Sequence, residues 1–165
     1  MIRVAVVTVS DSSAAGIRED RSGPALETRA AELGWNVVER RLLPDDADAI
    51  AEVLAALSDG ARVDVILTTG GTGVSARDVT PEAAARIAGK EIPGFGEVMR
   101  AEGRKSTKMA ALSRGGAVTR GTTLIVTLPG SPKGALESLN ATADLIPHVV
   151  DLLHGRTSHE PKLSS

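Results

Sequence analysis

The chain lacks cysteine and tyrosine, and Trp35 and Phe95 are its only Trp or Phe residues. Without cysteine it has no disulfide, no thiolate nucleophile and no cysteine-ligated zinc. Two aromatic rings are too few for the stacking platforms that bind single-stranded nucleic acid. No charge excess is present either, because 19 Lys and Arg residues face 21 Asp and Glu residues, for a net charge of −2. We therefore expect no nucleic-acid partner.

Long hydrophobic runs are also missing. The apolar segment at residues 2–9 is too short and lacks the flanks of a signal peptide. No apolar run approaches the ~18 residues that suggest a membrane-spanning helix. These absences predict a cytoplasmic protein with no membrane partner. A length of 165 residues suits one domain, which we expect over residues 1–154, followed by a polar tail over residues 155–165.

The sequence does contain a regular alternation of strand and helix patterns. Two apolar segments rich in valine and other β-branched residues, at residues 2–9 and 63–68, predict strands, and the nearly unbroken first one is typical of a strand buried on both faces. A further strand is predicted between them at residues 37–43. Amphipathic helical patterns separate them at residues 24–33 and 50–60. This order is typical of a parallel sheet covered by helices on both faces.

The second half of the chain departs from this alternation. A strand, a tight turn and a second strand over residues 117–128 predict an antiparallel edge strand. A helix is expected after Pro132, with a bend at Pro147. Residues 11–22 form a polar segment predicted to be a loop, and loops of such length are more often functional than idle. The predicted fold class is α/β, a three-layer α/β/α sandwich with a mostly parallel sheet and an antiparallel edge strand.

A glycine-rich segment, Gly70–Gly73, directly follows the third predicted strand. Ligands of parallel α/β sheets bind beyond the carboxyl ends of the strands. Closely spaced glycines let backbone N–H groups approach an anion. The segment is neither a Walker loop nor a dinucleotide-binding fingerprint. A glycine-rich bend without any ligand is the alternative interpretation.

Two aspartates, Asp45 and Asp78, each lie between a predicted strand and a helix. Carboxylates in such loops can hold Mg²⁺, which bridges protein carboxylate and substrate phosphate. Helix capping is the alternative for an aspartate in this position, and it is the better interpretation for Asp46 and Asp48. Thr80 is the better-placed cap of the helix after Asp78, which leaves that carboxylate free for other work.

Two further loops carry groups suited to a phosphate ligand. Asp11 follows Ser10 at the end of the first strand, caps no obvious helix and is a candidate to contact metal or substrate. Ser131 lies at a predicted helix start with Lys133 close by, an arrangement that attracts phosphate. Simple capping by Ser131 is the alternative.

Three more cations flank a serine-containing stretch and are candidates to face an anion: Lys105, Lys108 and Arg114. Taken singly, solvated surface charge is the simpler interpretation of each. From the residues alone, the glycine segment and the loop carboxylates indicate Mg²⁺-dependent handling of a phosphate-bearing ligand.

The same loops resemble a known family. Residues 68–82, which read TTGGTGVSARDVTPE, are similar to the signature of the MoaB/Mog family of molybdenum-cofactor proteins. Further motifs match in family order: VSDS at 9–12, LPDD at 43–46, IPGFGE at 92–97, ALSR at 111–114 and LPGSPK at 128–133. The resemblance extends from residue 2 to about residue 153.

The resemblance implies a molybdopterin-binding fold that usually forms a homotrimer. Active members of the family are molybdopterin adenylyltransferases, which join AMP from ATP to the terminal phosphate of molybdopterin. They use Mg²⁺ and release pyrophosphate. A MoeA-type molybdate insertase is the implied partner, since the activated pterin passes to it.

Family motifs also imply roles for particular residues. Asp45 and Asp78 match the two carboxylates associated with adenylyl transfer, with Asp78 as the expected Mg²⁺ ligand and Asp45 positioning the nucleotide and metal. The remaining matched positions are expected to bind pterin or nucleotide: Ser10, Asp11, Thr69, Gly70, Gly71, Thr72, Gly73, Thr80, Pro81, Ser113, Pro129, Gly130, Ser131 and Lys133.

Two other functions compete with the enzyme. A MoaB-like protein that binds molybdopterin or a nucleotide without turnover is the first, and a scaffold of the gephyrin kind is the second. The Asp45 and Asp78 pair favours catalysis, because a pure carrier does not need it. The shortage of aromatics adds one expectation: the flat rings of both substrates must be held by backbone groups, aliphatic surfaces and phosphate contacts, with Phe95 packing its own loop.

Overall fold

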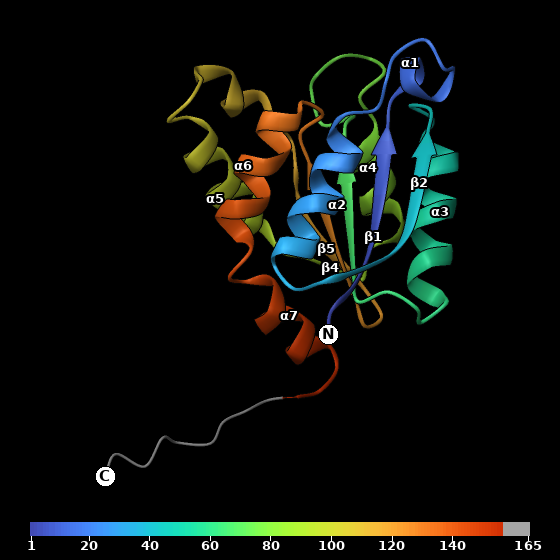
Figure 1. Ribbon diagram of the computed structural model, residues 1–165, viewed down its shortest axis with the longest axis vertical. Helices are drawn as coiled ribbons and strands as arrows, with labels where there is room; N and C mark the ends of the chain where they lie inside the picture. The colour runs from blue at the N-terminus through green and yellow to red at the C-terminus, as the bar shows by residue number, and fades with distance from the viewer. Residues whose placement is uncertain (157–165) are drawn as a thin grey trace.

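The computed structural model of the chain describes residues 1–156, which form a six-stranded sheet between two layers of helices (Figure 1). Across the sheet the strands follow the order β2-β1-β3-β6-β5-β4. Their bounds are β1 Arg3–Val9, β2 Asn36–Leu43, β3 Val65–Thr69, β4 Lys90–Glu91, β5 Gly116–Arg120 and β6 Thr123–Leu128.

The sheet is mostly parallel, as the sequence predicts. Strand β1 pairs in parallel with β2 and β3, and β3 pairs in parallel with β6. Strand β5 is antiparallel to β6, which confirms the predicted strand–turn–strand unit. Beyond β5 lies the two-residue strand β4, which the sequence analysis did not predict because so short a segment carries no alternation pattern.

Helices cover both faces of the sheet. Their bounds are α1 Asp11–Ala14, α2 Ser22–Glu32, α3 Ala47–Asp59, α4 Thr80–Ile87, α5 Pro93–Gly103, α6 Pro132–Thr142 and α7 Ile146–Leu153, with a 3-10 helix, η1, at Lys108–Leu112. Helices α2, α5 and α6 lie on one face, and α3 and α4 lie on the other (Figure 1). The connections that follow β1, β2 and β3 gather at the carboxyl end of the sheet, whereas α7 lies near the amino end (Figure 1).

The apolar runs of the strands build two hydrophobic cores. Neighbouring side chains of a strand point to opposite faces, so Leu67 packs with Leu26 and Leu139 on one face while Ile66 packs with Ile50 on the other. Each of these side chains is fully buried, and burying one stabilises the fold by about 1.5–3 kcal/mol. This double burial explains why the strands read as continuous apolar segments.

Three local predictions differ from the structure. The segment 11–22 is not entirely a loop, because it contains α1 and ends on the first residue of α2. Thr80 is not a helix cap: Val79 occupies that position and Thr80 is the first residue of α4. The final helix does not bend at Pro147 but is interrupted before it, between α6 and α7. None of the helices described is long and apolar enough to cross a membrane. Most of the expected tail, residues 157–165, lies outside the described residues.

Candidate active site

Two adjacent cavities lie at the carboxyl end of the sheet. One measures about 440 Å³ and is lined by residues of the connections that follow β1, β2, β3 and β6. We call it the polar cavity. The other measures about 450 Å³ and lies between α5, η1 and α6. We call it the apolar cavity. Gly130 and Ser131 line both, so ligands in the two cavities would meet at this loop.

The polar cavity brings together the two predicted catalytic aspartates, Asp45 and Asp78. Asp45 is held by a reciprocal pair of hydrogen bonds. The Asp11 N–H donates to Asp45 Oδ2 at 3.0 Å, and the Asp45 N–H donates to Asp11 Oδ1 at 2.9 Å. The connection after β1 therefore fixes the connection after β2.

Arg77 extends this network from the connection that follows β3. Its guanidinium donates to both carboxylate oxygens of Asp11, at 2.9 Å each. These hydrogen bonds lower the pKa of Asp11, so its carboxylate stays ionised. Asp11 does not line either cavity. It serves as a bridge between Arg77 and the backbone of Asp45, a role that its position in the sequence did not reveal.

The carboxyl group of Asp45 is poorly compensated. Burial raises its pKa, and the negative charges of Asp11 and Asp78 add to the increase. Neither Asp45 nor Asp78 forms a salt bridge within residues 1–156. Two carboxylates that share a partly buried cavity and form no salt bridge of their own are suited to a divalent cation.

The neighbouring carboxylate, Asp78, is oriented by its own loop. Its Oδ2 atom accepts hydrogen bonds from Ser75 N at 3.0 Å and Ser75 Oγ at 2.8 Å. Among the described residues no group of three or more His, Cys, Asp or Glu side chains forms a ready metal site. The residues therefore fit Mg²⁺, which keeps several waters and takes its other ligands from substrate phosphates. They do not fit a metal that needs a complete protein shell.

The glycine loop has a structural reason for its composition. Gly70 and Gly71 adopt φ angles of +103° and +69°, which L side chains rarely adopt. A Cβ at Gly70 would lie 2.1 Å from the Val9 carbonyl oxygen, and one at Gly71 would lie 2.2 Å from Thr80 Oγ. Thr80 in turn donates to the Gly70 carbonyl at 3.0 Å. The bend interpretation thus accounts for these glycines, while both also line the polar cavity.

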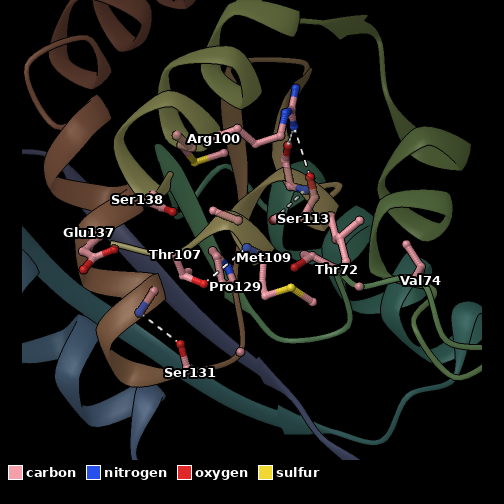
Figure 2. Close-up of a pocket in the computed structure, with 18 residues that line it drawn as sticks. Thr72, Val74, Arg100, Thr107, Met109, Ser113, Pro129, Ser131, Glu137 and Ser138 are labelled. Atoms are coloured by element: carbon pink, nitrogen blue, oxygen red, sulfur yellow. Dashed lines mark hydrogen bonds between the residues drawn. The ribbon is translucent and has the colours of Figure 1, made fainter. Parts of the chain in front are cut away.

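The apolar cavity has hydrophobic walls with a few polar groups facing it (Figure 2). Methionine, leucine and proline side chains supply the walls, at Met99, Met109, Leu112 and Pro129. Hydroxyl and carboxylate groups interrupt them at Thr72, Thr107, Ser113, Glu137 and Ser138. No aromatic side chain lines either cavity, because Phe95 and Trp35 belong to the hydrophobic core. A flat ring here would rest on aliphatic and thioether surfaces.

The predicted substrate residues divide between the two cavities. Ser10, Thr69, Gly70 and Gly71 line the polar cavity, and Thr72, Gly73, Ser113 and Pro129 line the apolar one. Thr80, Pro81 and Lys133 line neither.

Lys133 lines neither cavity but lies beside a residue that does. Its side chain is largely exposed, and its Nζ lies 3.7 Å from the carboxylate of Glu137, one turn along α6, which lines the apolar cavity. Ser131 caps this helix by accepting from Gly134 N at 3.0 Å. Capping at Asp46, which accepts from Ala49 N at 2.8 Å, follows the interpretation favoured from sequence.

Sequence analysis missed four charged residues of the polar cavity, Arg18, Glu19, Asp20 and Arg21. Asp20 accepts hydrogen bonds from Thr8 Oγ at 2.8 Å, Gly23 N at 3.0 Å and Arg40 at 3.0 Å. The two arginines bring positive charge to a cavity that otherwise contains carboxylates. The length and charge of the segment 11–22 were the available signal, although no motif singled out these positions.

Comparison with known proteins decides the family. The family described as "Probable molybdopterin binding domain" matches residues 5–148. The chain belongs to this family. It is 40% identical to a molybdopterin adenylyltransferase of Helicobacter pylori over 156 residues, which cover 93% of this chain and 89% of that protein. It is also 40% identical to the Escherichia coli protein of the same name over 157 residues, which cover 93% and 79%.

A solved structure agrees with the family assignment. The molybdopterin biosynthesis enzyme MoaB of Thermus thermophilus is 46% identical to this chain, with a TM-score of 0.88 over 94% of this chain and 98% of that one. As a member of the molybdopterin-binding family, the chain therefore has the MoaB/MogA fold that its sequence motifs resemble.

Proposed function

We propose that this protein is a molybdopterin adenylyltransferase of molybdenum-cofactor biosynthesis. It transfers AMP from ATP to the terminal phosphate of molybdopterin and releases pyrophosphate. The observation that carries the proposal is the pair of uncompensated carboxylates, Asp45 and Asp78, in a cavity that adjoins a second, ring-sized cavity. Relatives that are 40% identical over most of the chain bear the name of this enzyme.

The contrast between the cavities supports an assignment of the two substrates. The polar cavity suits the polyphosphate of ATP, because Arg18 and Arg21 supply positive charge there. The apolar cavity suits the pterin, whose ring would lie against the Met109 and Pro129 side chains with Ser113 within the same wall (Figure 2). The absence of aromatic side chains from the residues that line both cavities supports the proposal that the rings are held without aromatic stacking.

The reacting phosphates would meet at the loop that both cavities share. Ser131 is the N-cap of α6, an eleven-residue helix that begins at Pro132, so the shared loop leads into a helix N-terminus. Such an N-terminus favours a phosphate group. A terminal phosphate oxygen of the pterin forms the new bond to the α-phosphorus of ATP, and the bond to pyrophosphate breaks. No protein nucleophile is required, so positioning and charge neutralisation supply the catalysis.

Mg²⁺ is the expected cofactor, with Asp78 and Asp45 as the residues that would hold it. When bound, it would neutralise charge on the polyphosphate and leaving pyrophosphate. The chain's own residues do the rest: Asp11 and Arg77 hold Asp45 in place, and Ser75 orients the Asp78 carboxylate. The family resemblance also supports a homotrimer in the cytoplasm and transfer of the product to a MoeA-type insertase.

The proposal is tested by incubating the protein with molybdopterin, ATP and Mg²⁺. We expect adenylylated pterin and an equal amount of pyrophosphate, both abolished by chelation of Mg²⁺. Calorimetric binding of the same ligands serves as the second measurement. Binding of molybdopterin without any product would contradict the enzyme and favour the non-catalytic binding protein, which the carboxylate pair disfavours.

A further inference from the structure

Arg114 lines a third cavity and contacts loops that line the other two. The residue is exposed, as expected for a surface charge, but its guanidinium is also engaged by four hydrogen bonds. Lys105, in contrast, forms an exposed pair with Glu102 one turn away. The side chain of Arg114 follows Ser113, which lines the apolar cavity, and reaches the loop that carries Asp78, which lines the polar cavity.

The contacts of Arg114 span the loop from Thr72 to Asp78, which continues from the end of the glycine segment. Its backbone N–H donates to the Thr72 carbonyl at 2.8 Å. Its Nε donates to the Gly73 carbonyl at 2.8 Å, and its Nη2 donates to the Asp78 carbonyl at 2.9 Å. The side chain of Arg77 ties the same loop to Asp11, whereas Arg114 holds the backbone carbonyls of Gly73 and Asp78 and so fixes the backbone that carries the Asp78 carboxylate.

Glu82, in the first turn of α4, holds the guanidinium in this orientation. Its carboxylate accepts hydrogen bonds from Nη1 and Nη2 of Arg114, and these bonds lower the pKa of Glu82. A guanidinium has five N–H donors. With two carbonyls and a carboxylate as acceptors, Arg114 has little capacity left to bind a substrate phosphate directly.

A second arginine fixes the backbone on both sides of Arg114. Arg100, in α5, donates from Nη1 to the Ser113 carbonyl at 3.3 Å and to the Gly115 carbonyl at 3.1 Å. Gly96 permits this approach, because a Cβ there would lie 2.7 Å from the Gly115 carbonyl oxygen. Helix α5 thereby sets the direction in which Arg114 leaves the chain.

We propose that Arg114 is a positioning residue that holds the Asp78 loop in a fixed relation to Ser113 and so aligns the two substrate cavities. The inference rests on the proposed function for its catalytic consequence, but its structural core is independent of that function. A lysine cannot replace the arginine, because a single ammonium group can pair with Glu82 but cannot also reach both carbonyls in the geometry of a planar fork.

The chain offers a matched control in Arg120. This arginine also binds a carboxylate with two nitrogens, Asp59 at 2.9 Å each, and donates to one backbone carbonyl, that of Ile87, at 3.0 Å. It lines neither cavity. Arg120→Gln therefore removes a clamp of the same chemistry away from the site.

The first test is amide hydrogen exchange of the folded protein without ligands. In Arg114→Gln we expect exchange in residues 72–80 to become about tenfold faster, because the Ser75 and Asp78 amides lose their support. Arg120→Gln should leave this segment unchanged. Arg114→Lys keeps the charge and is expected to behave like Arg114→Gln. Unchanged exchange in both Arg114 variants would overturn the proposal, whether or not the protein is an enzyme.

The second test is kinetic. We expect Arg114→Gln to lower kcat about 30- to 100-fold, because small misplacements near the reacting groups have effects of this size. The KM for ATP should change less than threefold. The concentration of Mg²⁺ needed for half-maximal rate should rise. Adding Arg114→Gln to Asp78→Asn should cost little more activity, because the two act as a unit. Full activity of Arg114→Lys, or additive losses in the double variant, would contradict positioning. An inactive wild-type protein with faster exchange in Arg114→Gln would refute the proposed function alone.

Discussion

Asp64, at the amino end of the sheet, and Asp45, at its carboxyl end, have pKa values that are shifted in opposite directions. At the amino end, Asp64 has a side chain only 8% exposed and accepts hydrogen bonds from Arg3 N and Nη2 at 2.8 Å and from Arg3 Nε at 3.1 Å. Burial would raise its pKa, but the hydrogen bonds and charge of Arg3 outweigh burial and lower the pKa to about 2. At the carboxyl end, burial and the nearby negative charges raise the pKa of Asp45, and the backbone N–H of Asp11 and the charge of Arg77 compensate for this only in part.

This difference indicates that Asp64 contributes to stability, whereas Asp45 is retained for function. Asp64 also contacts His154 Nε2 at 3.1 Å, so it joins the start of β1 to the end of α7. The Asp45 carboxylate accepts a hydrogen bond from the Asp11 N–H, but it forms no salt bridge and burial disfavours its ionised form. A protein tolerates such unfavourable charge where function requires it. The comparison therefore predicts which aspartate matters for activity and which for stability.

The largest effect is expected from Asp78→Asn. Loss of the carboxylate charge should reduce kcat/KM for adenylyl transfer at limiting Mg²⁺ by about 10²–10³-fold, as for other groups that stabilise charge in the transition state. Asn keeps an oxygen for the Ser75 hydrogen bonds, so the melting temperature should change little. Steady-state kinetics over a Mg²⁺ series measure the effect, with Asp48→Asn, an exposed carboxylate paired with Arg86, as control. Full activity of Asp78→Asn at limiting Mg²⁺ would remove this residue from the site.

The opposite pattern is expected from Asp64→Asn. Losing the charged pair with Arg3 should lower the free energy of unfolding by about 2 kcal/mol and the melting temperature by about 5 °C, with kcat/KM unchanged at 25 °C. Thermal unfolding and the kinetic assay measure the two quantities. A loss of activity without a loss of stability would reverse the comparison.

At acidic pH, the free energy of unfolding should fall as the Asp64 carboxylate becomes protonated. Because the pKa of Asp64 is lowered in the folded state, its stabilisation is complete above the unfolded value of about 3.9 and is lost as the pH falls toward 2. The difference in unfolding free energy between wild type and Asp64→Asn should shrink over this range. Urea unfolding between pH 5 and 2 measures it, and a constant difference would contradict the assignment.

The smallest effect is the expected change in melting temperature caused by Asp45→Asn. The raised pKa of Asp45 means that its ionised form is unfavourable in the folded state at neutral pH. Removing the charge should therefore raise the melting temperature by about 1–2 °C, while an amide oxygen still accepts from the Asp11 N–H. Activity should fall. Calorimetry at pH 7 compares the variant with Asp46→Asn, and a lower melting temperature would show that Asp45 is structural.

Much of the fold is encoded in patterns that a single sequence displays. Strands buried on both faces produce the apolar runs around Val6 and Ile66, and amphipathic helices produce the spacing around Leu54. Strand β4 escaped prediction because two residues have no periodicity. The cap of α4 was misplaced because Thr80, a favourable cap residue by type, is used instead to bind the Gly70 carbonyl.

The site was predictable in its motifs and less so in its contacts. Asp45 and Asp78 lie in loops that follow parallel strands, so their approach to one cavity follows from topology. The role of Arg114 did not follow, because its partners Gly73, Asp78 and Glu82 are more than thirty residues away in sequence. The substrate role expected for Lys133 stays a prediction, and its side chain lies beside Glu137, which lines the apolar cavity.

Adenylyl transfer from ATP labelled at the α-phosphate tests the central claim most directly. The label is followed into molybdopterin with the wild-type protein and with Asp78→Asn at equal concentrations and limiting Mg²⁺. Our account predicts labelled pterin with the wild type, at least ~100-fold less with the variant, and no label in the pterin when ATP is labelled at the γ-phosphate. Equal labelling by both proteins, or label arriving from the γ-phosphate, would contradict it.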